Sequence, residues 1–343
     1  MRCSVRSLAI AFALLASAAV VTGFNQAPDD CEFIRLQIDA LPTGGGVIQL
    51  PAGIFECKAK IVLKKSNVTI SGAGRTLTTL RLANFSEDPL LVIGDDRVIL
   101  DNETGNWVTA TRVANIVVSD LTVDGNLANQ DPFKECGKGS CSGDVSNIRN
   151  NAITIRGASY VTLLRVTAHS AISGGLVTEK YCDHLHVKDF SSYGNYFDGF
   201  AGYQTEQSLF ENLDLSHNRG AGISIDIDFN ENRFLNGTLT SNGDVGIFAR
   251  FLHGVVFENL VISGSGNHGA FLAQSGHADS CANDNEFRSV TVEGSNGFGI
   301  YLASACTGNK VTGTSLFQNN KSGCMHVNSK TSMQVDSTVQ CLN

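Results

Sequence analysis

Three short segments, Gly199-Phe-Ala-Gly-Tyr203, Gly222-Ile-Ser-Ile-Asp226 and Gly246-Ile-Phe-Ala-Arg250, follow one another at almost constant spacing. Each segment starts with glycine and continues as a short, mostly apolar run with the length of a β-strand. The pattern occurs seven times, at intervals of 24, 23, 24, 23, 30 and 24 residues. Its glycines are Gly175, Gly199, Gly222, Gly246, Gly269, Gly299 and Gly323. The regular interval predicts a repeat architecture with one such strand in every repeat.

Further positions agree when the repeats are aligned on these glycines. The residue twelve places before the glycine is always apolar: Leu163, Val187, Phe210, Phe234, Phe257, Phe287 and Val311. Seven places before it stand Ala168, Ser192, Leu215, Leu239, Ile262, Val292 and Leu316. Four places before it stand Asn195, Asn218, Asn242, Ser265, Ser295 and Asn319. Asparagine tolerates a left-handed backbone, so this last column predicts one bend that is repeated in every turn.

Coils of about 23 residues, each holding two or three short strands, are typical of a parallel β-helix. We therefore predict an all-β fold, a single-domain right-handed parallel β-helix. Asp29 and Asp30 can cap a short helix over residues 31–41, which would cover the open end of the first coil. Residues 127–150 form a long polar loop that either walls a binding groove or contributes nothing to it.

The N-terminal residues have the composition of a secretory signal peptide. Arg2 and Arg6 precede an apolar run over residues 8–15, and small residues follow. The apolar run is too short to cross a bilayer. We therefore expect residues 1–23 to be removed and residues 24–343 to form the β-helical domain of a secreted, extracellular or cell-wall protein that has no contact with a membrane.

The cysteines agree with export. Pairing of cysteines that are close in sequence predicts the disulfides Cys31–Cys57, Cys136–Cys141, Cys281–Cys306 and Cys324–Cys341, with Cys182 left free. Sequence alone leaves other connectivities open. Zinc ligation is the weaker alternative, because no C-x-x-C motif occurs. Five N-x-S/T sequons fit a glycosylated secreted protein, and they lie at Asn67, Asn84, Asn102, Asn236 and Asn320.

The charge balance argues against nucleic acid as a partner. The formal charge is −8, and removal of Arg2 and Arg6 takes it to about −10. An acidic protein still binds a polyanion where a few cations line its groove. We expect a monomer whose partner is a polysaccharide rather than nucleic acid.

The fourth position after each glycine carries the candidate chemistry. Side chains of a strand alternate, so this position faces outward when the first and third face the core. It holds Glu179, Tyr203, Asp226 and Arg250 in four successive coils, which lie about 4.8 Å apart. Such a line can provide acid–base groups and a cation for a substrate carboxylate. The alternative is that outward residues of a solenoid are polar without having a function.

Other candidate substrate-binding residues lie beside this line in the repeat. They are Lys180, Gln204, His253 and Gln274 after the strands, and Tyr196, His217 and His268 before them. Asp198, at the start of a strand, is a candidate catalytic residue together with Tyr203, Asp226 and Arg250. Calcium binding to Asp226 and Asp228 is possible, but two carboxylates are too few to define a site. The sequence requires no cofactor and defines no metal site.

Residues 194–205, Gly-Asn-Tyr-Phe-Asp-Gly-Phe-Ala-Gly-Tyr-Gln-Thr, together with His217-Asn-Arg-Gly-Ala-Gly-Ile-Ser-Ile-Asp226, resemble the catalytic coils of mannuronan C-5 epimerases, which are secreted β-helix enzymes. Residues 43–55 and 67–75 resemble the first coils of the pectate-lyase-like superfamily. The epimerase motif is Tyr-Gly-Phe-Asp-Pro-His, followed one coil later by Asp-Gly-Phe and a carboxylate. The resemblance places the family's tyrosine at Asp198, its catalytic histidine at Tyr203 and its later aspartate at Asp226.

The resemblance implies conversion of mannuronate to guluronate within alginate, by removal of the C-5 proton and its return from the opposite face. In this interpretation Arg250 neutralises the substrate carboxylate and Tyr203 transfers one proton, with its pKa lowered by Arg250 or Lys180. Asp226 positions Tyr203, and His217, His253 or His268 is the reserve proton carrier. Expulsion of the 4-O substituent would instead make the protein a β-eliminating lyase. A non-catalytic, polysaccharide-binding wall protein is the third possibility.

Overall fold

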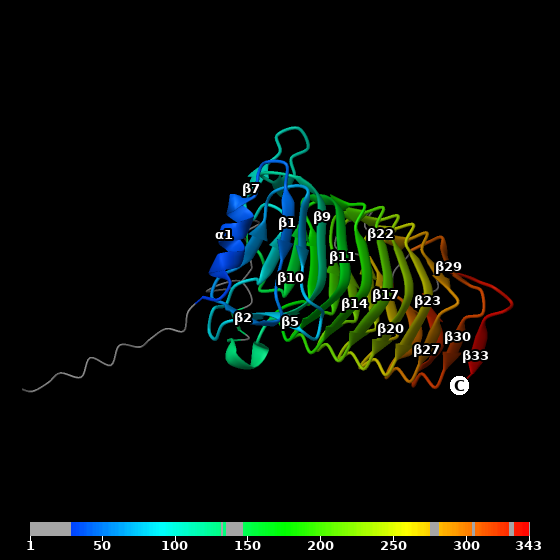
Figure 1. The fold of residues 1–343 in the computed structure, drawn as a ribbon. Coiled ribbons are helices and arrows are strands. Elements are labelled where there is room, and N and C mark those ends of the chain that lie inside the picture. The colour runs from blue at the N-terminus through cyan, green and yellow to red at the C-terminus, as the bar shows by residue number, and fades with distance from the viewer. Residues whose placement is uncertain are drawn as a thin grey trace, which may run out of the picture.

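The coils stack in one direction along a single axis. The structure is a computed structural model that describes residues 29–131, 133–134, 147–274, 281–303, 306–328 and 333–342. The stack begins at helix α1 (Glu32–Ala40) and ends at β33 (Gln340–Leu342) (Figure 1). Two parallel sheets run along it, one of 21 strands and one of 10. The predicted parallel β-helix is confirmed.

The 10-stranded sheet contains the strands that follow the repeated glycines. Its first strands are β3 (Ile61–Leu63), β6 (Leu91–Ile93) and β10 (Ile153–Arg156). The other seven are β12 (Leu176–Glu179), β15 (Phe200–Gly202), β18 (Ile223–Ile225), β21 (Ile247–Arg250), β24 (Ala270–Ala273), β28 (Phe298–Leu302) and β31 (Gly323–Val327). Neighbouring strands are parallel, and from β12 to β28 residues at the same repeat position lie side by side.

The larger sheet is built from long strands that bend in the middle. They are β9 (Val113–Asp124), β11 (Ala158–His169), β14 (His186–Tyr193), β17 (Leu209–Ser216), β20 (Arg233–Thr240) and β23 (Val256–Ser263). Each strand carries one left-handed residue at the bend: Asp120, Arg165, Asp189, Asn212, Asn236 or Asn259. Asparagine and aspartate adopt this backbone more readily than most residues do, which explains their repeated use. The sequon residue Asn236 is therefore an exposed corner residue.

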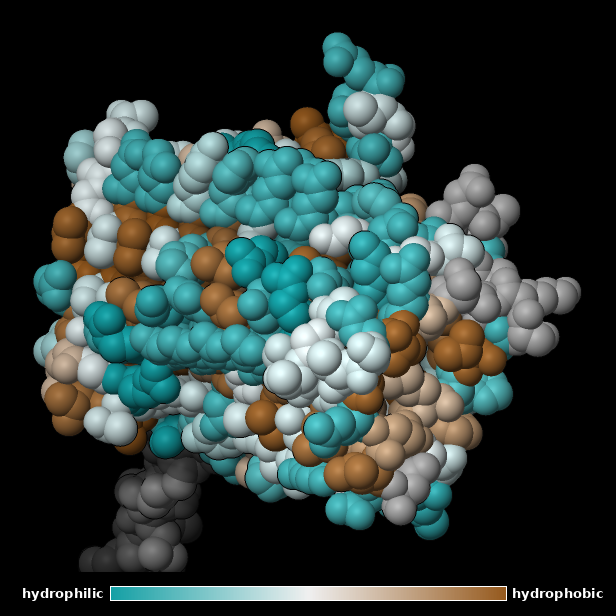
Figure 2. Space-filling view, turned by 90° about the vertical axis from the view of Figure 1, so that its right-hand side faces the viewer, coloured by the Kyte–Doolittle hydropathy of each residue, from teal (hydrophilic) through white to brown (hydrophobic). Residues whose placement is uncertain are grey.

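Shorter strands complete the larger sheet. At the N-terminal end lie β1 (Gly46–Gln49), β2 (Gly53–Cys57), β4 (Val68–Ser71) and β5 (Thr78–Leu82). Between the bent strands and the 10-stranded sheet lie β13 (Cys182–Asp183), β16 (Thr205–Glu206), β19 (Phe229–Asn230), β22 (Leu252–His253) and β25 (Ala282–Asn283). Toward the C-terminal end lie β26 (Glu286–Arg288), β27 (Thr291–Glu293), β29 (Asn309–Thr312), β30 (Leu316–Gln318) and β32 (Met333–Val335). In a space-filling view, rows of hydrophilic side chains run across the stack with hydrophobic ones between them (Figure 2).

The core follows the predicted apolar columns. Phe210, Phe234, Phe257 and Phe287 are fully buried and stack from coil to coil, with ring centroids 4.7, 5.3 and 4.9 Å apart. The prediction is wrong in the last coil, where Phe317 rather than Leu316 is buried and pairs with Val292. The reason is a shift in register, because Gly323 pairs with Phe298 and leaves Cys324 in the place of the glycine.

The asparagine column forms a buried ladder. Asn195 Nδ2 donates to Asn218 Oδ1 at 2.8 Å, and Asn218 Nδ2 donates to Asn242 Oδ1 at 3.1 Å. These side chains satisfy polar groups inside the turn and do not themselves adopt the left-handed backbone, contrary to prediction. The left-handed residues are the ones directly before them: Gly194, His217, Ser241, Gly264, Gly294 and Asn319. In the last coil the ladder residue is accordingly Asn320 and not Asn319.

Both ends of the solenoid are tied to their neighbours. Helix α1 lies within the predicted range, buries Ile34 and Ile38, and is joined to β2 through the disulfide Cys31–Cys57. The predicted disulfides Cys281–Cys306 and Cys324–Cys341 also form, and Cys182 is free and buried. The predicted Cys136–Cys141 pair and the signal peptide lie outside the described residues. Across the described ranges, no helix has the length and apolar character needed to span a bilayer.

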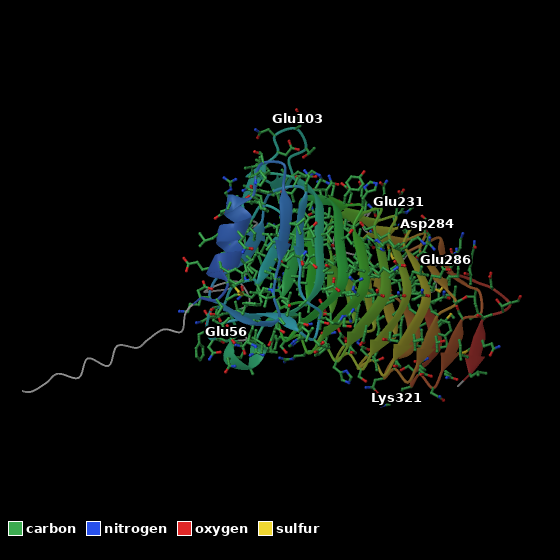
Figure 3. The ribbon with its side chains drawn as sticks, viewed as in Figure 1. Glu56, Glu103, Glu231, Asp284, Glu286 and Lys321 are labelled. Carbon is green, nitrogen blue, oxygen red and sulfur yellow. A yellow bond between two sulfur atoms is a disulfide. The ribbon has the colours of Figure 1, made fainter. Side chains whose placement is uncertain are left out.

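One hairpin departs from the repeat. Strands β7 (Val98–Leu100) and β8 (Trp107–Thr109) pair antiparallel between β6 and β9. The hairpin projects from the coils near the end covered by α1, and Glu103 lies at its tip (Figure 3).

The buried ladder predicts an asymmetry among asparagine substitutions. Asn218→Ala removes an acceptor for Asn195 and a donor to Ser192 and Asn242, all inside the turn, and should lower the free energy of unfolding by about 2–3 kcal/mol. The exposed Asn267→Ala is the control and should change it by less than about 0.5 kcal/mol. Urea denaturation of the two variants measures the difference, and equal losses would contradict the structural role of the ladder.

Candidate active site

The four predicted side chains stand in line on the 10-stranded sheet. Its register pairs Thr178 with Gly202, Gly202 with Ile225, and Ile225 with Ala249. The residues that follow them are Glu179, Tyr203, Asp226 and Arg250. The predicted alignment is therefore confirmed.

The line extends one coil further, to Arg156, which pairs with Glu179. Arg156 is fully buried, and its Nε lies 3.2 Å from Glu179 Oε1. Sequence analysis missed this residue because Ala152, not glycine, begins its coil. The alternating run Ile153-Thr-Ile-Arg156, one repeat length before Glu179, is the signal that identifies it.

A cleft of about 470 Å³ opens on the sheet over β12 and β15. Five of the predicted site residues line it: Glu179, Lys180, Asp198, Tyr203 and Gln204. Asn147 and Arg149, from the end of the long polar loop, line it as well. Of the two interpretations of that loop, the structure thus supports the one in which it walls a groove. Arg149 is a second cation that the sequence alone did not single out.

Asp198 is a carboxylate of the cleft whose pKa is raised toward neutrality. Burial raises its pKa from 3.8 to about 6, against the hydrogen bonds that its carboxylate accepts from the Ala221 amide, at 2.7 Å from Oδ1, and from Ser224. A carboxylate whose pKa lies near neutrality can take up and release a proton under ordinary conditions. Asp198 directly precedes the glycine of β15, so the turn before the strand positions it.

Tyr203 remains a neutral phenol at pH 7. Burial raises its pKa to about 12, and the charges of Asp198, Asp226 and Glu179 add to this, while Arg149 opposes them. The prediction that Arg250 or Lys180 lowers the pKa of Tyr203 is wrong, because burial and the carboxylates dominate. In this environment Tyr203 is suited to donate a proton or a hydrogen bond and not to act as a base.

The charges around Tyr203 are partly desolvated. Burial raises the pKa of Glu179, although Arg156 opposes the shift. Burial likewise lowers the pKa of Lys180, although Glu179 opposes it. The Lys180 amide donates to Gln204 Oε1 at 3.3 Å, which links the two neighbouring coils at the rim of the cleft. Ion pairs in such surroundings are stronger than exposed ones.

The guanidinium of Arg250 is paired with other side chains of the protein. It forms an ion pair with Asp226, and its guanidinium carbon lies 5.0 Å from the centroid of the Phe248 ring. Neither Arg250 nor Asp226 lines the cleft, whereas Arg149 and Lys180 do. The geometry therefore favours these two cations over Arg250 as partners for a substrate carboxylate.

Five other predicted residues lie away from the cleft. Tyr196 and His217 belong to the turn before the strand and border a separate depression, where Arg219 lies 4.2 Å from the Tyr196 ring centroid. His253 follows the left-handed bend at Phe251 and lies with its Nδ1 3.2 Å from Asp284 Oδ2. The remaining two are in later coils: His268 packs among aromatic rings and Gln274 bridges to Cys281.

Asp226, one of the two carboxylates considered for calcium, is thus paired with Arg250. Among the residues that the structure describes, no group of three or more His, Cys, Asp and Glu side chains is placed to hold a metal ion.

The fold and the cleft define a β-helix protein with a polar, partly desolvated groove. The chain belongs to the family described as right-handed β-helix region, which matches residues 153–339. Its curated relatives include Mannuronan C5-epimerase AlgE5 of Azotobacter vinelandii, which is 30% identical over 229 residues, or 64% of this chain and 21% of that protein. Alginate lyase 7 of the same organism is 28% identical over 201 residues, or 56% of this chain and 21% of that protein. The resemblance to the epimerases is confirmed.

The chain spans about a fifth of the length of these two relatives. Among solved structures, the A-module of Mannuronan C-5 epimerase AlgE4 from Azotobacter vinelandii matches with a TM-score of 0.64 at 19% identity. The match covers 86% of this chain and 75% of the module. At this identity the match shows a shared fold.

The raised pKa of Asp198 predicts a pH-dependent effect on stability. The folded protein binds the Asp198 proton more tightly than the unfolded chain does, so this group costs stability as the pH rises from about 4 through about 6. Asp198→Asn should therefore raise the free energy of unfolding by roughly 2–3 kcal/mol at pH 8, and by little at pH 4. Denaturation at both pH values measures the change. The exposed Asp214→Asn is the control, and an equal gain in both variants would contradict the assignment.

Proposed function

We propose that this protein is a polysaccharide C-5 epimerase that converts mannuronate to guluronate within alginate. The observation that carries the proposal is the pairing, in one cleft, of an aspartate with a pKa of about 6 and a neutral tyrosine. Two cations, Arg149 and Lys180, border the same cleft. These are the groups that removal and return of a proton next to a carboxylate require.

The chemistry begins with the substrate carboxylate. The C-5 proton of a uronate is weakly acidic, and neutralising the adjacent carboxylate stabilises the carbanion that forms on its removal. Arg149 and Lys180 supply that charge. Asp198 removes the proton as the base, because its pKa of about 6 lies near neutrality. Tyr203 then donates a proton to C-5 from the opposite face of the sugar, and the resulting phenolate is reprotonated by solvent.

The positions of Asp198 and Tyr203 support this division of roles. Asp198 precedes and Tyr203 follows the three residues of β15, so the two groups approach the cleft from opposite ends of one strand. They also occupy the positions at which the family motif has tyrosine and histidine. A carboxylate and a phenol in place of a phenol and an imidazole still provide one base and one acid, with the base now at Asp198.

A β-eliminating lyase is the second candidate, and one finding favours it specifically. Alginate lyase 7 matches nearly as well as the epimerases do. Both reactions start with loss of the C-5 proton, and they differ in whether the carbanion is protonated or expels the 4-O substituent. The same acid, Tyr203, can serve either C-5 or the leaving oxygen.

Incubation of the purified protein with polymannuronate distinguishes the candidates. New guluronate signals in the proton NMR spectrum without ultraviolet absorbance from unsaturated ends would support the epimerase. Unsaturated ends would identify a lyase. No change in any polyuronate tested would reject both reactions and leave a non-catalytic binding protein.

Substitution of the two proton-transfer groups tests the mechanism. Asp198→Asn and Tyr203→Phe should each lower kcat by about 10²- to 10⁴-fold while leaving the circular-dichroism spectrum unchanged. Tyr193→Phe, an exposed tyrosine on the larger sheet, is the matched control and should retain full activity. Full activity in the Asp198 or Tyr203 variant would remove that residue from the mechanism.

The position of Arg149 at the cleft predicts that its substitution changes KM, whereas substitution of an arginine elsewhere does not. Arg149→Ala should raise KM for polymannuronate about tenfold, because a charge that faces the substrate is lost. Arg233→Ala removes an exposed arginine that pairs with Glu258 on the larger sheet, and should leave KM unchanged. Steady-state kinetics measures both, and an equal effect would contradict local binding of the carboxylate at the cleft.

We also propose that the protein is secreted as a single-domain, glycosylated monomer after removal of residues 1–23. The three described disulfides support this, because such bonds persist in oxidising compartments. An anionic polysaccharide is the proposed partner, and neither nucleic acid nor a membrane is.

A further inference from the structure

The outward position two residues after each repeat glycine changes along the 10-stranded sheet. In the coils of the cleft it holds small residues: Val177, Ala201 and Ser224. In the following coils it holds the aromatic rings Phe248, Phe271 and Tyr301, and the row ends at His326, which lies three residues after Gly323 and pairs with Tyr301 through the register shift of the last coil. These four side chains are half-buried, and we call them the aromatic ladder. The position-four residues beside the ladder are reduced to Ala273 and Ala303, so the charged part of the line ends where the rings begin.

The rings of the ladder stack on one another. Phe248 and Phe271 have centroids 5.6 Å apart with planes 12° apart, and Phe271 and Tyr301 are 5.7 Å and 7° apart. Tyr301 and His326 are 4.6 Å and 11° apart. Neighbouring rings thus face each other at a distance that leaves no room for a sugar between them, and these half-buried rings can offer a ligand only their edges. The usual stacking of a sugar on an open aromatic face is therefore unavailable within the ladder.

Ring edges favour a different ligand chemistry. The edge of an aromatic ring is positive and its face negative, so an exposed row of edges attracts carboxylate oxygens more than neutral hydroxyl groups. His268 adds a directed donor beside the ladder, since it stacks on Tyr301 at 4.6 Å. Its Nδ1 accepts the Phe298 amide at 2.9 Å, which places the proton of the neutral ring on Nε2.

The ladder lies on the same sheet as the cleft, and the coil of β18 lies between the two. Phe248 belongs to the same strand as Arg250, whose guanidinium lies over the Phe248 ring and is paired with Asp226. Asp226 lies one coil from Tyr203, at the coil spacing of about 4.8 Å. That spacing is close to the length of one pyranose in an extended chain, so a polymer seated in the cleft and running along the axis would meet one coil per sugar.

We propose that the aromatic ladder, together with His268, binds the uronate residues of the polysaccharide that lie beyond the residue in the cleft. The ladder binds them through their carboxylates, by ring edges and the His268 Nε2–H, and so selects long polyuronate chains over short ones. This inference rests on the proposed function, because it assumes that the cleft holds one uronate of the same chain.

Length-dependent binding tests the proposal without turnover. Isothermal titration calorimetry of the full protein carrying Asp198→Asn should show affinity for mannuronate oligomers rising from the disaccharide to the octasaccharide. Adding Tyr301→Ala should weaken octasaccharide binding about tenfold and leave disaccharide binding unchanged. Phe271→Leu keeps an apolar side chain of similar size and should have the same effect. Tyr193→Ala is the control, because Tyr193 also stacks on a histidine, His169, at 5.0 Å, but on the larger sheet.

The outcomes distinguish failure of the proposed role of the ladder from failure of the proposed function of the cleft. Carboxyl-reduced, neutral oligomers of the same lengths should show no gain in affinity with length. An equal gain for neutral oligomers, or unchanged octasaccharide binding in both ladder variants, would overturn the role of the ladder while leaving the proposed reaction standing. Absence of binding by any mannuronate oligomer would reject the proposed substrate itself, and the ladder's role with it.

Discussion

The spacing of hydrogen-bonded coils is the constraint on which the rest of the structure depends. Each coil lies about 4.8 Å from the next, so residues at the same repeat position are forced into contact. Apolar columns meet this constraint by stacking, as the four core phenylalanines do, and polar columns by ladders such as Asn195–Asn218–Asn242. Charged columns must alternate in sign or neutralise one another.

The candidate site follows directly from that rule. Arg156 neutralises Glu179 at one end of the line and Arg250 neutralises Asp226 at the other, which leaves Tyr203 between two carboxylates. Burial is the main reason that the pKa of Tyr203 is raised, and the charges of Asp198 and of the two flanking carboxylates add to it, so the tyrosine stays neutral. A line of residues that the sequence suggested as an acid–base set is therefore a neutral proton donor held between two ion pairs.

Much of the fold and part of the candidate site were predictable from sequence, because residues one repeat apart in the sequence of a solenoid lie next to each other in the structure. The glycine interval and the apolar columns were sufficient for the fold and for the alignment of Glu179 to Arg250, and the proximity of cysteines in the sequence was sufficient for three disulfides. Arg149 was not predictable, because it lies in a loop outside the repeat and its place at the cleft is not fixed by the coil spacing. The prediction that His253 belongs to the site was wrong for a related reason. The left-handed backbone at Phe251 changes the direction of the chain, so His253 lies away from the cleft.

The corner that follows the position-four column has a consequence for how such proteins diversify. The β7–β8 hairpin leaves the stack near this corner, shortly after Gly94, and the longer interval of the repeat falls at the same corner, where Gln274 bridges to Cys281. Neither interrupts the sheets on either side. Natural or engineered changes of the loops at this corner can therefore reshape the rim of the groove while the stacked interior stays untouched.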